Sequence, residues 1–388
     1  MSPSTVTEQP RDSRYHDLDA LRAFAILVVI LFHTGGLASG FPVPGGKPGA
    51  WTLRWCVSTA HAFQMPVFFM MSGFFGAMAV ARSGAERFAR NRLTRIGIPL
   101  VVGWIAMVPL LNAIAVWGQH LRGAHTEPVG ASTLFNQKLH HLWFLWYLLM
   151  FCALVLAIRA LAARRPAVEA GVRRVFGGVV ESRWRLPVLV LLTTAILIPA
   201  PLWTIAVPPV ITPDADPFVY FGLFFGFGWL LYGQRELLPR LRAAPLLHIL
   251  VAFAMSIAVI VILESGPSRH DQLAHFAVIT ATALVTWTAI LGLLGFFHRW
   301  FSRSNPRVRY ASDAAYFLYL GHLPLVTAGW YSLTELGAPF WIKLFGVPVA
   351  TIAVLLLAYD RLVRYTAVGR VLHGPRARSP QAVGAEGS

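Results

Sequence analysis

Long apolar runs separated by short polar segments make up most of this chain. Most runs are close to the ~20 residues that an α-helix needs to cross a bilayer core of roughly 30 Å. The segments between them gather arginine, glycine and proline. The pattern therefore predicts an all-α, polytopic membrane protein with about ten transmembrane helices, at residues 18–38, 57–80, 96–117, 140–160, 186–205, 218–232, 245–263, 273–297, 310–330 and 340–359.

The same pattern predicts one membrane domain, residues 17–365, between two cytoplasmic tails. Residues 1–16 are polar and expected to be disordered, and residues 366–388 are basic and then disordered. The glycine- and proline-rich connection 40–50 is predicted to be non-helical. The basic segment 164–185 is predicted to be a polar loop, with part of it in an interfacial helix.

Composition supports the membrane assignment and narrows the partners. Of 388 residues, 56% are hydrophobic and 13% are charged, whereas soluble domains carry about 25% charged residues. The net charge of +16 would suit nucleic acid, but the basic residues are dispersed among apolar spans. We therefore expect membrane lipids as partners and no nucleic acid. The two cysteines, Cys56 and Cys152, give neither a disulfide framework nor a metal-ligand spacing.

The distribution of basic residues predicts the orientation. Nearly all arginines fall in the two tails and in the connections at 82–95, 164–185, 235–242 and 299–309. Few basic residues lie in the other connections: Lys47, Arg54, Arg122, Lys138, Arg269 and Lys343. By the positive-inside rule, both termini are cytoplasmic and residues 118–139 face outward. We expect a multi-pass protein of the inner (plasma) membrane.

The first span carries two residues that hydrocarbon disfavours, Arg22 and His33. They are eleven positions apart, so at 100° per residue both side chains share one helix face, with a rise of roughly 16 Å between them. Ionisable groups inside a membrane are costly, and this makes the pair a candidate functional site. The alternative is that Arg22 snorkels to lipid phosphates and His33 bonds a neighbouring helix.

An arginine cluster precedes the third span. Arg92 and Arg95 are spaced to share a helix face, and Arg90 stands beside them. Such clusters hold phosphates through bidentate hydrogen bonds. The competing interpretation is a topology signal that contacts lipid headgroups.

Further polar and aromatic residues occur at the ends or middle of spans. His141 and Trp143 open the fourth span, and Tyr319 and His322 lie within the ninth. Pro324 leaves the carbonyl one turn earlier without its helical partner. In the second span, Pro66 and the pair Ser72-Gly73 predict a kink or close helix packing. No Walker-type loop, HExxH, GxSxG or metal-ligand motif occurs, and no permanently bound cofactor is expected.

Five of these stretches, taken in order, resemble the acyltransferase 3 family of integral-membrane O-acyltransferases. They are Leu18-Asp-Ala-Leu-Arg22 with ten residues before His33, Pro66-Val-Phe-Phe-Met-Met-Ser-Gly73, Arg90-Asn-Arg92-Leu-Thr-Arg95, His141-Leu-Trp-Phe-Leu-Trp-Tyr147 and Tyr316-Phe-Leu-Tyr-Leu-Gly-His322-Leu-Pro. The fourth stretch and the ten-span layout look most like the glucan-modifying, succinyl-transferring branch. Larger members of the family add a periplasmic hydrolase-like domain. We expect no such domain in this chain, and therefore expect the membrane part to recognise the acceptor.

The resemblance implies an enzyme that moves an acetyl or succinyl group from a cytoplasmic acyl-CoA-type donor to a hydroxyl of a cell-envelope carbohydrate. It makes Arg22 and His33 the essential pair, with His33 as the general base or as an acylated relay. Arg22 would hold the donor or pair with Asp19. The resemblance assigns donor binding to the arginine motif, and we extend this assignment to Arg95. Candidate substrate-binding residues are Asp19, His141, Trp143, Tyr319 and His322.

Two other classes of function use the same residues differently. In a proton-coupled transporter of a carbohydrate or small metabolite, the buried Arg and His would form the proton pathway. In a catalytically silent assembly subunit they would have no chemical role. The sequence gives no prediction of oligomeric state.

Overall fold

The computed structural model describes residues 14–121, 138–199, 210–266, 268 and 271–373. Within these ranges the chain is helical, without a strand beyond one isolated bridge between Lys138 and Val210. The helices are α1 (His16–Ala38), α2 (Gly46–Ser83), α3 (Ala85–Arg92), α4 (Ile98–Leu121), α6 (Trp143–Ala162), α7 (Pro166–Glu181), α8 (Arg185–Leu197), α9 (Ala215–Gly233), α10 (Leu238–Leu241), α11 (Pro245–Glu264), α12 (Gln272–Phe301), α13 (Pro306–Glu335), α14 (Phe340–Ala358) and α15 (Ala367–His373). A π-helical turn, Leu93–Gly97, joins α3 to α4, another, Tyr359–Val363, follows α14, and 3-10 turns cover His140–Leu142 and Arg235–Leu237.

The prediction of an all-α, polytopic membrane protein is confirmed. In the described part of the chain, eight helices are long and apolar enough to cross a membrane. Two predicted spans fall outside this set: α8 has 13 residues, and α13 is long but too polar. Ten spans and cytoplasmic termini therefore stay predictions.

One local prediction is wrong. The connection 40–50 was expected to be non-helical, but α2 already begins at Gly46 and includes Pro48. A proline in the first helical turn forfeits no intrahelical hydrogen bond, because the N–H groups of that turn have no partner in any case. Gly45, with φ of 86°, precedes the helix in the left-handed region that glycine adopts readily.

The predicted tails and the second basic connection are described only in part. Residues 1–13 and 374–388 lie outside the described ranges, while residues 367–373 of the expected C-terminal tail form α15. The segment expected to be partly an interfacial helix contains α7.

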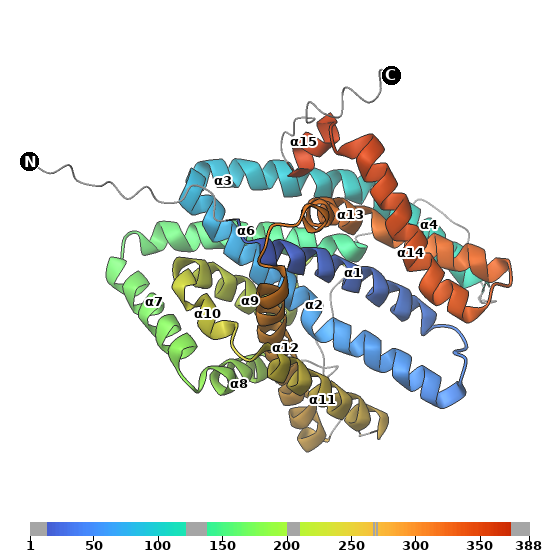
Figure 1. The fold of residues 1–388 in the computed structure, drawn as a ribbon, viewed down its shortest axis with the longest axis horizontal. Helices are drawn as coiled ribbons and strands as arrows, with labels where there is room; N and C mark the ends of the chain where they lie inside the picture. Colours follow the sequence, from blue (N-terminus) through green and yellow to red (C-terminus); the bar gives the residue numbers. More distant parts are fainter. Residues whose placement is uncertain (1–13, 122–137, 200–209, 267, 269–270, 374–388) are drawn as a thin grey trace, which may run out of the picture.

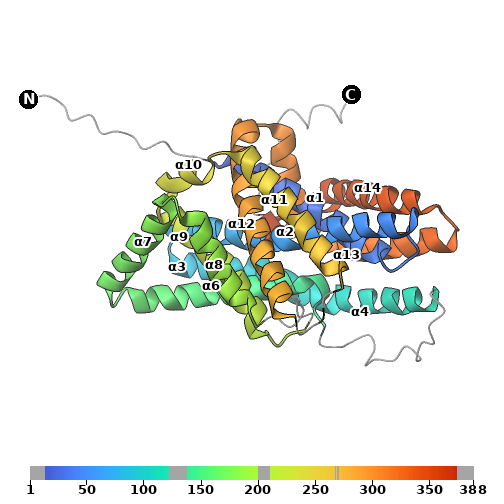
Figure 2. The same ribbon diagram turned by 90° about the horizontal axis from the view of Figure 1, so that it is seen from below.

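Helix α1 lies inside the bundle, against α2, α12, α13 and α14 (Figure 1). Helices α11 and α12 pack as a neighbouring pair at one side (Figures 1 and 2). Many apolar side chains on the outer helices are exposed, for example Val101, Leu191 and Phe345 at 56%, 63% and 62%. In a membrane protein such side chains face lipid, so the polar groups gathered inside the bundle require a separate explanation.

Close packing of α2 and α9 depends on two glycines. A Cβ built on Gly73 would overlap the carbonyl oxygen of Phe225, and one on Gly228 would overlap the carbonyl oxygen of Met70. The expectation of close packing at Ser72-Gly73 is therefore confirmed. Small residues permit this backbone approach in membrane bundles, where van der Waals contact replaces the hydrophobic driving force.

Candidate active site

A cavity of about 720 Å³ runs between α1, α2, α6 and α13. Its lining follows the helical period: residues 22, 29 and 33 of α1, residues 61 to 79 of α2 at intervals of three or four, and residues 312, 315, 316 and 319 of α13. Each helix thus presents one face to the same space. The sequence predicted that Arg22 and His33 share one face of the first span. The structure agrees with this prediction, since both side chains line the cavity.

Arg22 is held at one end of the cavity by polar and aromatic partners. Its Nη1 lies 3.3 Å from Asp19 Oδ1 and 3.4 Å from Ser312 Oγ, and its guanidinium carbon lies 4.7 Å from the centre of the Phe75 ring. Asp19 also accepts hydrogen bonds from Arg14 at 2.6 Å and from Ser312 at 3.2 Å. The expected pairing of Arg22 with Asp19 is present. The network fixes the position of the guanidinium group beside the cavity.

The arginine motif is divided by the structure. Arg92 and Arg95 line the cavity, at the end of α3 and in the π-helical turn. Arg92 lies over the Phe88 ring at 4.8 Å, and its buried Nε has no hydrogen-bond partner among the described residues. Arg90 points elsewhere: its side chain is 77% exposed and pairs with Glu86 at 2.8 Å.

His33 lies farther along α1, among other rings. Its ring centre is 5.1 Å from that of His322 and 5.2 Å from that of Phe32, and Phe32 stacks on His61 at 5.6 Å. His33 and His61 line the cavity, and His322 packs behind His33 with 0% exposure. The cavity thus connects a group of arginines with a group of histidines.

His141 and Tyr319 join the 3-10 turn His140–Leu142 to α13 by reciprocal hydrogen bonds. His141 Nε2 lies 3.1 Å from the carbonyl oxygen of Leu320, and the Tyr319 hydroxyl donates to the His141 carbonyl. Both side chains line the cavity, as does Trp143, which packs against Phe221 at 5.1 Å between ring centres. Two other predicted substrate-binding residues do not line the cavity. Asp19 bonds Arg22, and His322 contacts His33.

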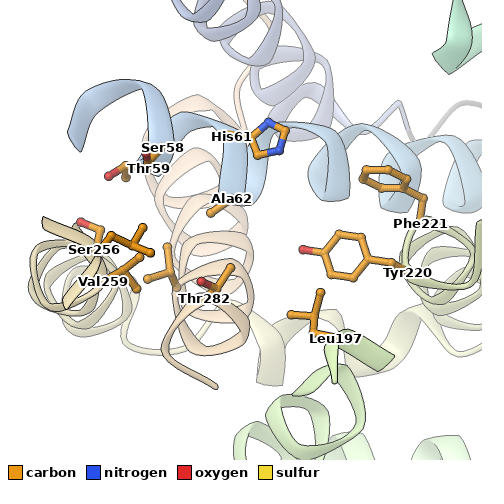
Figure 3. Close-up of a pocket in the computed structure, with 12 residues that line it drawn as sticks. Ser58, Thr59, His61, Ala62, Leu197, Tyr220, Phe221, Ser256, Val259 and Thr282 are labelled. Carbon is orange, nitrogen blue, oxygen red and sulfur yellow. The ribbon is translucent and has the colours of Figure 1, made fainter. Parts of the chain in front are cut away.

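A second, smaller cavity of about 40 Å³ lies beside the first (Figure 3). Its lining is mostly apolar but includes the hydroxyl groups of Thr59, Ser256 and Thr282, and its volume suffices for a few water molecules. His61 lines both cavities.

Three further residues are important in the large cavity, and none of them is among the predicted catalytic or binding residues. Gln64 is 3% exposed, lines the cavity and has a buried Oε1 without a hydrogen-bond partner in the described part of the chain. Ser312 and Phe75 hold Arg22. Gln64 stands out in the sequence as a polar residue at the outer end of an apolar span, whereas Ser312 and Phe75 were missed because their contacts with Arg22 depend on which helices pack together. Among the described residues, no cluster of His, Cys, Asp or Glu has the arrangement of a metal site.

The fold and this cavity define a helical, multi-pass membrane protein with a polar interior site. A family model described as an acyltransferase domain matches residues 15–360. The chain belongs to the acyltransferase 3 family, and it is therefore a membrane acyltransferase.

Similar curated proteins carry the name glucans biosynthesis protein C and come from Escherichia coli strains, including O157:H7 and O9:H4 (strain HS). Each is 25% identical to this chain over 326 residues, which cover 80% of this chain and 82% of the relative. No solved structure is significantly similar to the chain.

Proposed function

We propose that this acyltransferase moves a small acyl group, acetyl or succinyl, from a cytoplasmic acyl-CoA to a hydroxyl of a cell-envelope carbohydrate, within the inner membrane. The observation that carries the proposal is the single cavity lined by Arg22, Arg92 and Arg95 as well as by His33. It provides phosphate-binding cations and a proton acceptor in one connected space.

The arginines suit a donor that carries phosphates. Arg92 and Arg95 line the cavity from the segment that the positive-inside rule places in the cytoplasm, where acyl-CoA is found. The guanidinium group binds phosphate oxygens in a bidentate manner. The unpartnered Nε of Arg92 leaves donor capacity for this purpose. From there the pantetheine arm extends along the cavity and brings the thioester towards His33.

His33 suits the transfer step. A neutral imidazole accepts the proton of an acceptor hydroxyl while the hydroxyl oxygen attacks the thioester carbonyl carbon. The new C–O ester bond forms, the C–S bond breaks, and the proton passes to the departing thiolate to give CoA. If His33 is instead acylated first, the same bonds are exchanged in two steps.

The acceptor is assigned to the part of the cavity near His33. Gln64 Oε1 offers a hydrogen-bond acceptor to a sugar hydroxyl, and Trp143 offers an aromatic face. The name of the E. coli relatives, glucans biosynthesis protein C, supports a glucan as the carbohydrate.

The test compares cells with and without the protein. Mass spectrometry of envelope glycans is expected to show a loss of +42 or +100 Da substituents, about the masses of acetyl and succinyl groups, when the protein is absent. Purified protein with acetyl-CoA or succinyl-CoA and a gluco-oligosaccharide should release CoA thiol and form the corresponding ester. Unchanged glycans together with no thiol release would contradict the proposal. Transport of an unmodified sugar into proteoliposomes would instead favour the transporter.

A further inference from the structure

His322 is a fully buried histidine that uses half of its hydrogen-bonding capacity. Its Nδ1 lies 2.6 Å from the carbonyl oxygen of Tyr319. A carbonyl can only accept, so Nδ1 carries the hydrogen, and Nε2 of the neutral ring is an acceptor. This Nε2 is buried and has no partner among the residues that the structure describes. Native proteins rarely leave a buried acceptor without a donor.

The rings around His322 narrow the choice of donor. His141, at 5.2 Å between ring centres, already gives its Nε2 hydrogen to the Leu320 carbonyl, so its Nδ1 is also an acceptor. The Tyr319 hydroxyl donates to the His141 carbonyl. Among these described neighbours, His33 is left as the ring with an N–H to give.

The distance between His33 and His322 fits such a bond. Their ring centres are 5.1 Å apart, with a tilt of 43° between the rings. An in-line N–H···N bond between two imidazoles places the ring centres roughly 5 Å apart. The two rings need only a change of orientation, or one bridging water, to complete the bond.

We propose that His322 is a positioning residue for His33. By accepting the hydrogen of one ring nitrogen of His33, Nε2 of His322 fixes the tautomer of His33 and directs the lone pair of its other nitrogen into the cavity. Once His33 has taken the proton of the acceptor hydroxyl, the same bond is made by an imidazolium donor and becomes stronger. The inference rests on the proposed role of His33 as the base.

Two substitutions separate this role from packing. His322→Phe keeps an aromatic ring of similar volume without an acceptor, and His322→Gln restores an acceptor oxygen. We expect His322→Phe to lower kcat about 100-fold, the effect of misplacing a catalytic group, with an unchanged KM for acetyl-CoA. His322→Gln should recover activity to within about tenfold of wild type. His248→Phe is the matched control, because His248 bonds the Ala244 carbonyl of its own helix segment at 3.0 Å and lies at the beginning of α11, outside the lining of either cavity.

The measurement is thiol release from acetyl-CoA with a gluco-oligosaccharide, per mole of folded full-length protein. A second readout is ¹⁵N NMR of histidine-labelled protein, in which His33 should change from one tautomer to a mixture in His322→Phe. Wild-type kcat in His322→Phe, or equal loss in the Phe and Gln variants with an unchanged His33 tautomer, would overturn the inference. Full activity of His33→Ala would instead overturn the proposed role of His33. If His322→Phe does not fold, His322→Gln decides: a kcat within about tenfold of wild type with a single His33 tautomer supports the inference, whereas a mixture of His33 tautomers or a loss near 100-fold would overturn it.

Discussion

His141 donates the hydrogen of its Nε2 to the carbonyl oxygen of Leu320, 3.1 Å away. In an uninterrupted helix that carbonyl would accept from the N–H of residue 324, but residue 324 is a proline and has none. The missing helical bond thus provides the acceptor that fixes the orientation of the His141 ring. Through it the 3-10 turn before α6 is attached to α13 beside the candidate active site.

This relationship predicts that His141 and Pro324 are energetically coupled. His141→Phe should destabilise the protein by about 1–3 kcal/mol, because it leaves a partly buried carbonyl unpaired. In a Pro324→Ala background the Leu320 carbonyl regains its helical partner, and the same substitution should cost about 1 kcal/mol less. Thermal or denaturant unfolding of the four proteins in detergent measures the cycle. Additive effects within ~0.3 kcal/mol would show that the two residues are independent.

Gly73 provides a test of the α2–α9 contact. Gly73→Ala should destabilise the protein by at least about 1–3 kcal/mol, the usual cost of overpacking, because its Cβ would overlap the backbone of α9. Gly226→Ala, on α9 itself, is the matched control, since a Cβ at that position meets no atom of the described chain within 4 Å. Unfolding temperatures of both variants give the comparison. Equal unfolding temperatures for the two variants would mean that α2 and α9 can move apart at little cost in stability.

The orientation predicted from the arginines can be tested at Ser132, which lies outside the described residues. A Cys56→Ala, Cys152→Ala protein with Ser132→Cys should react with a membrane-impermeant maleimide in intact spheroplasts, because residues 118–139 are predicted to face outward. A cysteine placed at Ser302, in a connection predicted to be cytoplasmic, should react only after permeabilisation. The reverse pattern would invert the topology and move Arg92 and Arg95 away from cytoplasmic acyl-CoA.

The parts of the site that were predictable depend on local periodicity. Arg22 and His33 share a face because eleven helical steps return to nearly the same direction, and this holds whatever packs against α1. The pairing of Asp19 with Arg22 was also expected, whereas the position of Arg90 outside the cavity was not. Asp19 pairs with Arg22 at i,i+3, as its spacing allows, but its contact with Ser312 depends on how α13 packs against α1. Arg90 pairs with Glu86 at i,i+4, a spacing that was open to view, but spacing alone does not decide between this local pair and a place in the cavity.

The same contrast applies to the fold. Apolar length predicted the eight helices of the described chain that are long and apolar enough to cross a membrane, because hydrocarbon requires the backbone to satisfy its own hydrogen bonds. The beginning of α2 was missed because proline was treated as a helix breaker even in the first turn, where it is tolerated. The bond between His141 and Leu320 joins residues 179 positions apart and has no local signal.

His33→Ala tests the proposed base. The variant should lose roughly two to four orders of magnitude in rate, the usual contribution of general acid–base catalysis, while insertion and abundance stay near normal. The measurement is thiol release per mole of folded protein, with unfolding temperature recorded in parallel. If His33 serves only in packing, the variant should lose stability or yield and keep its activity per molecule, and the catalytic assignment would then be abandoned.

Arg92 distinguishes a donor site from a topology signal. If Arg92 binds a phosphate of the donor, Arg92→Ala should weaken acyl-CoA binding by about 2 kcal/mol or more, the typical cost of removing one partner of a desolvated charge pair. Arg92→Lys should recover only part of that loss, because an ammonium group cannot reproduce the bidentate geometry of guanidinium. If the cluster only sets topology, lysine should substitute fully, since the positive-inside rule does not distinguish the two residues.

The titration uses purified full-length protein and a non-hydrolysable acyl-CoA, followed by calorimetry or fluorescence. Arg87→Ala is the matched control: it removes one exposed positive charge from the same helix, α3, and lies outside the lining of the cavity. We expect wild type and Arg87→Ala to bind alike, Arg92→Lys to bind more weakly and Arg92→Ala to bind most weakly. Every variant except Arg92→Lys changes the net charge of the protein. We therefore repeat the titration at high salt, which screens the long-range attraction between the protein and acyl-CoA more than it weakens a direct contact. A loss of affinity in Arg92→Ala that persists at high salt supports a bound phosphate, whereas indistinguishable curves for all four proteins would exclude Arg92 from the donor site.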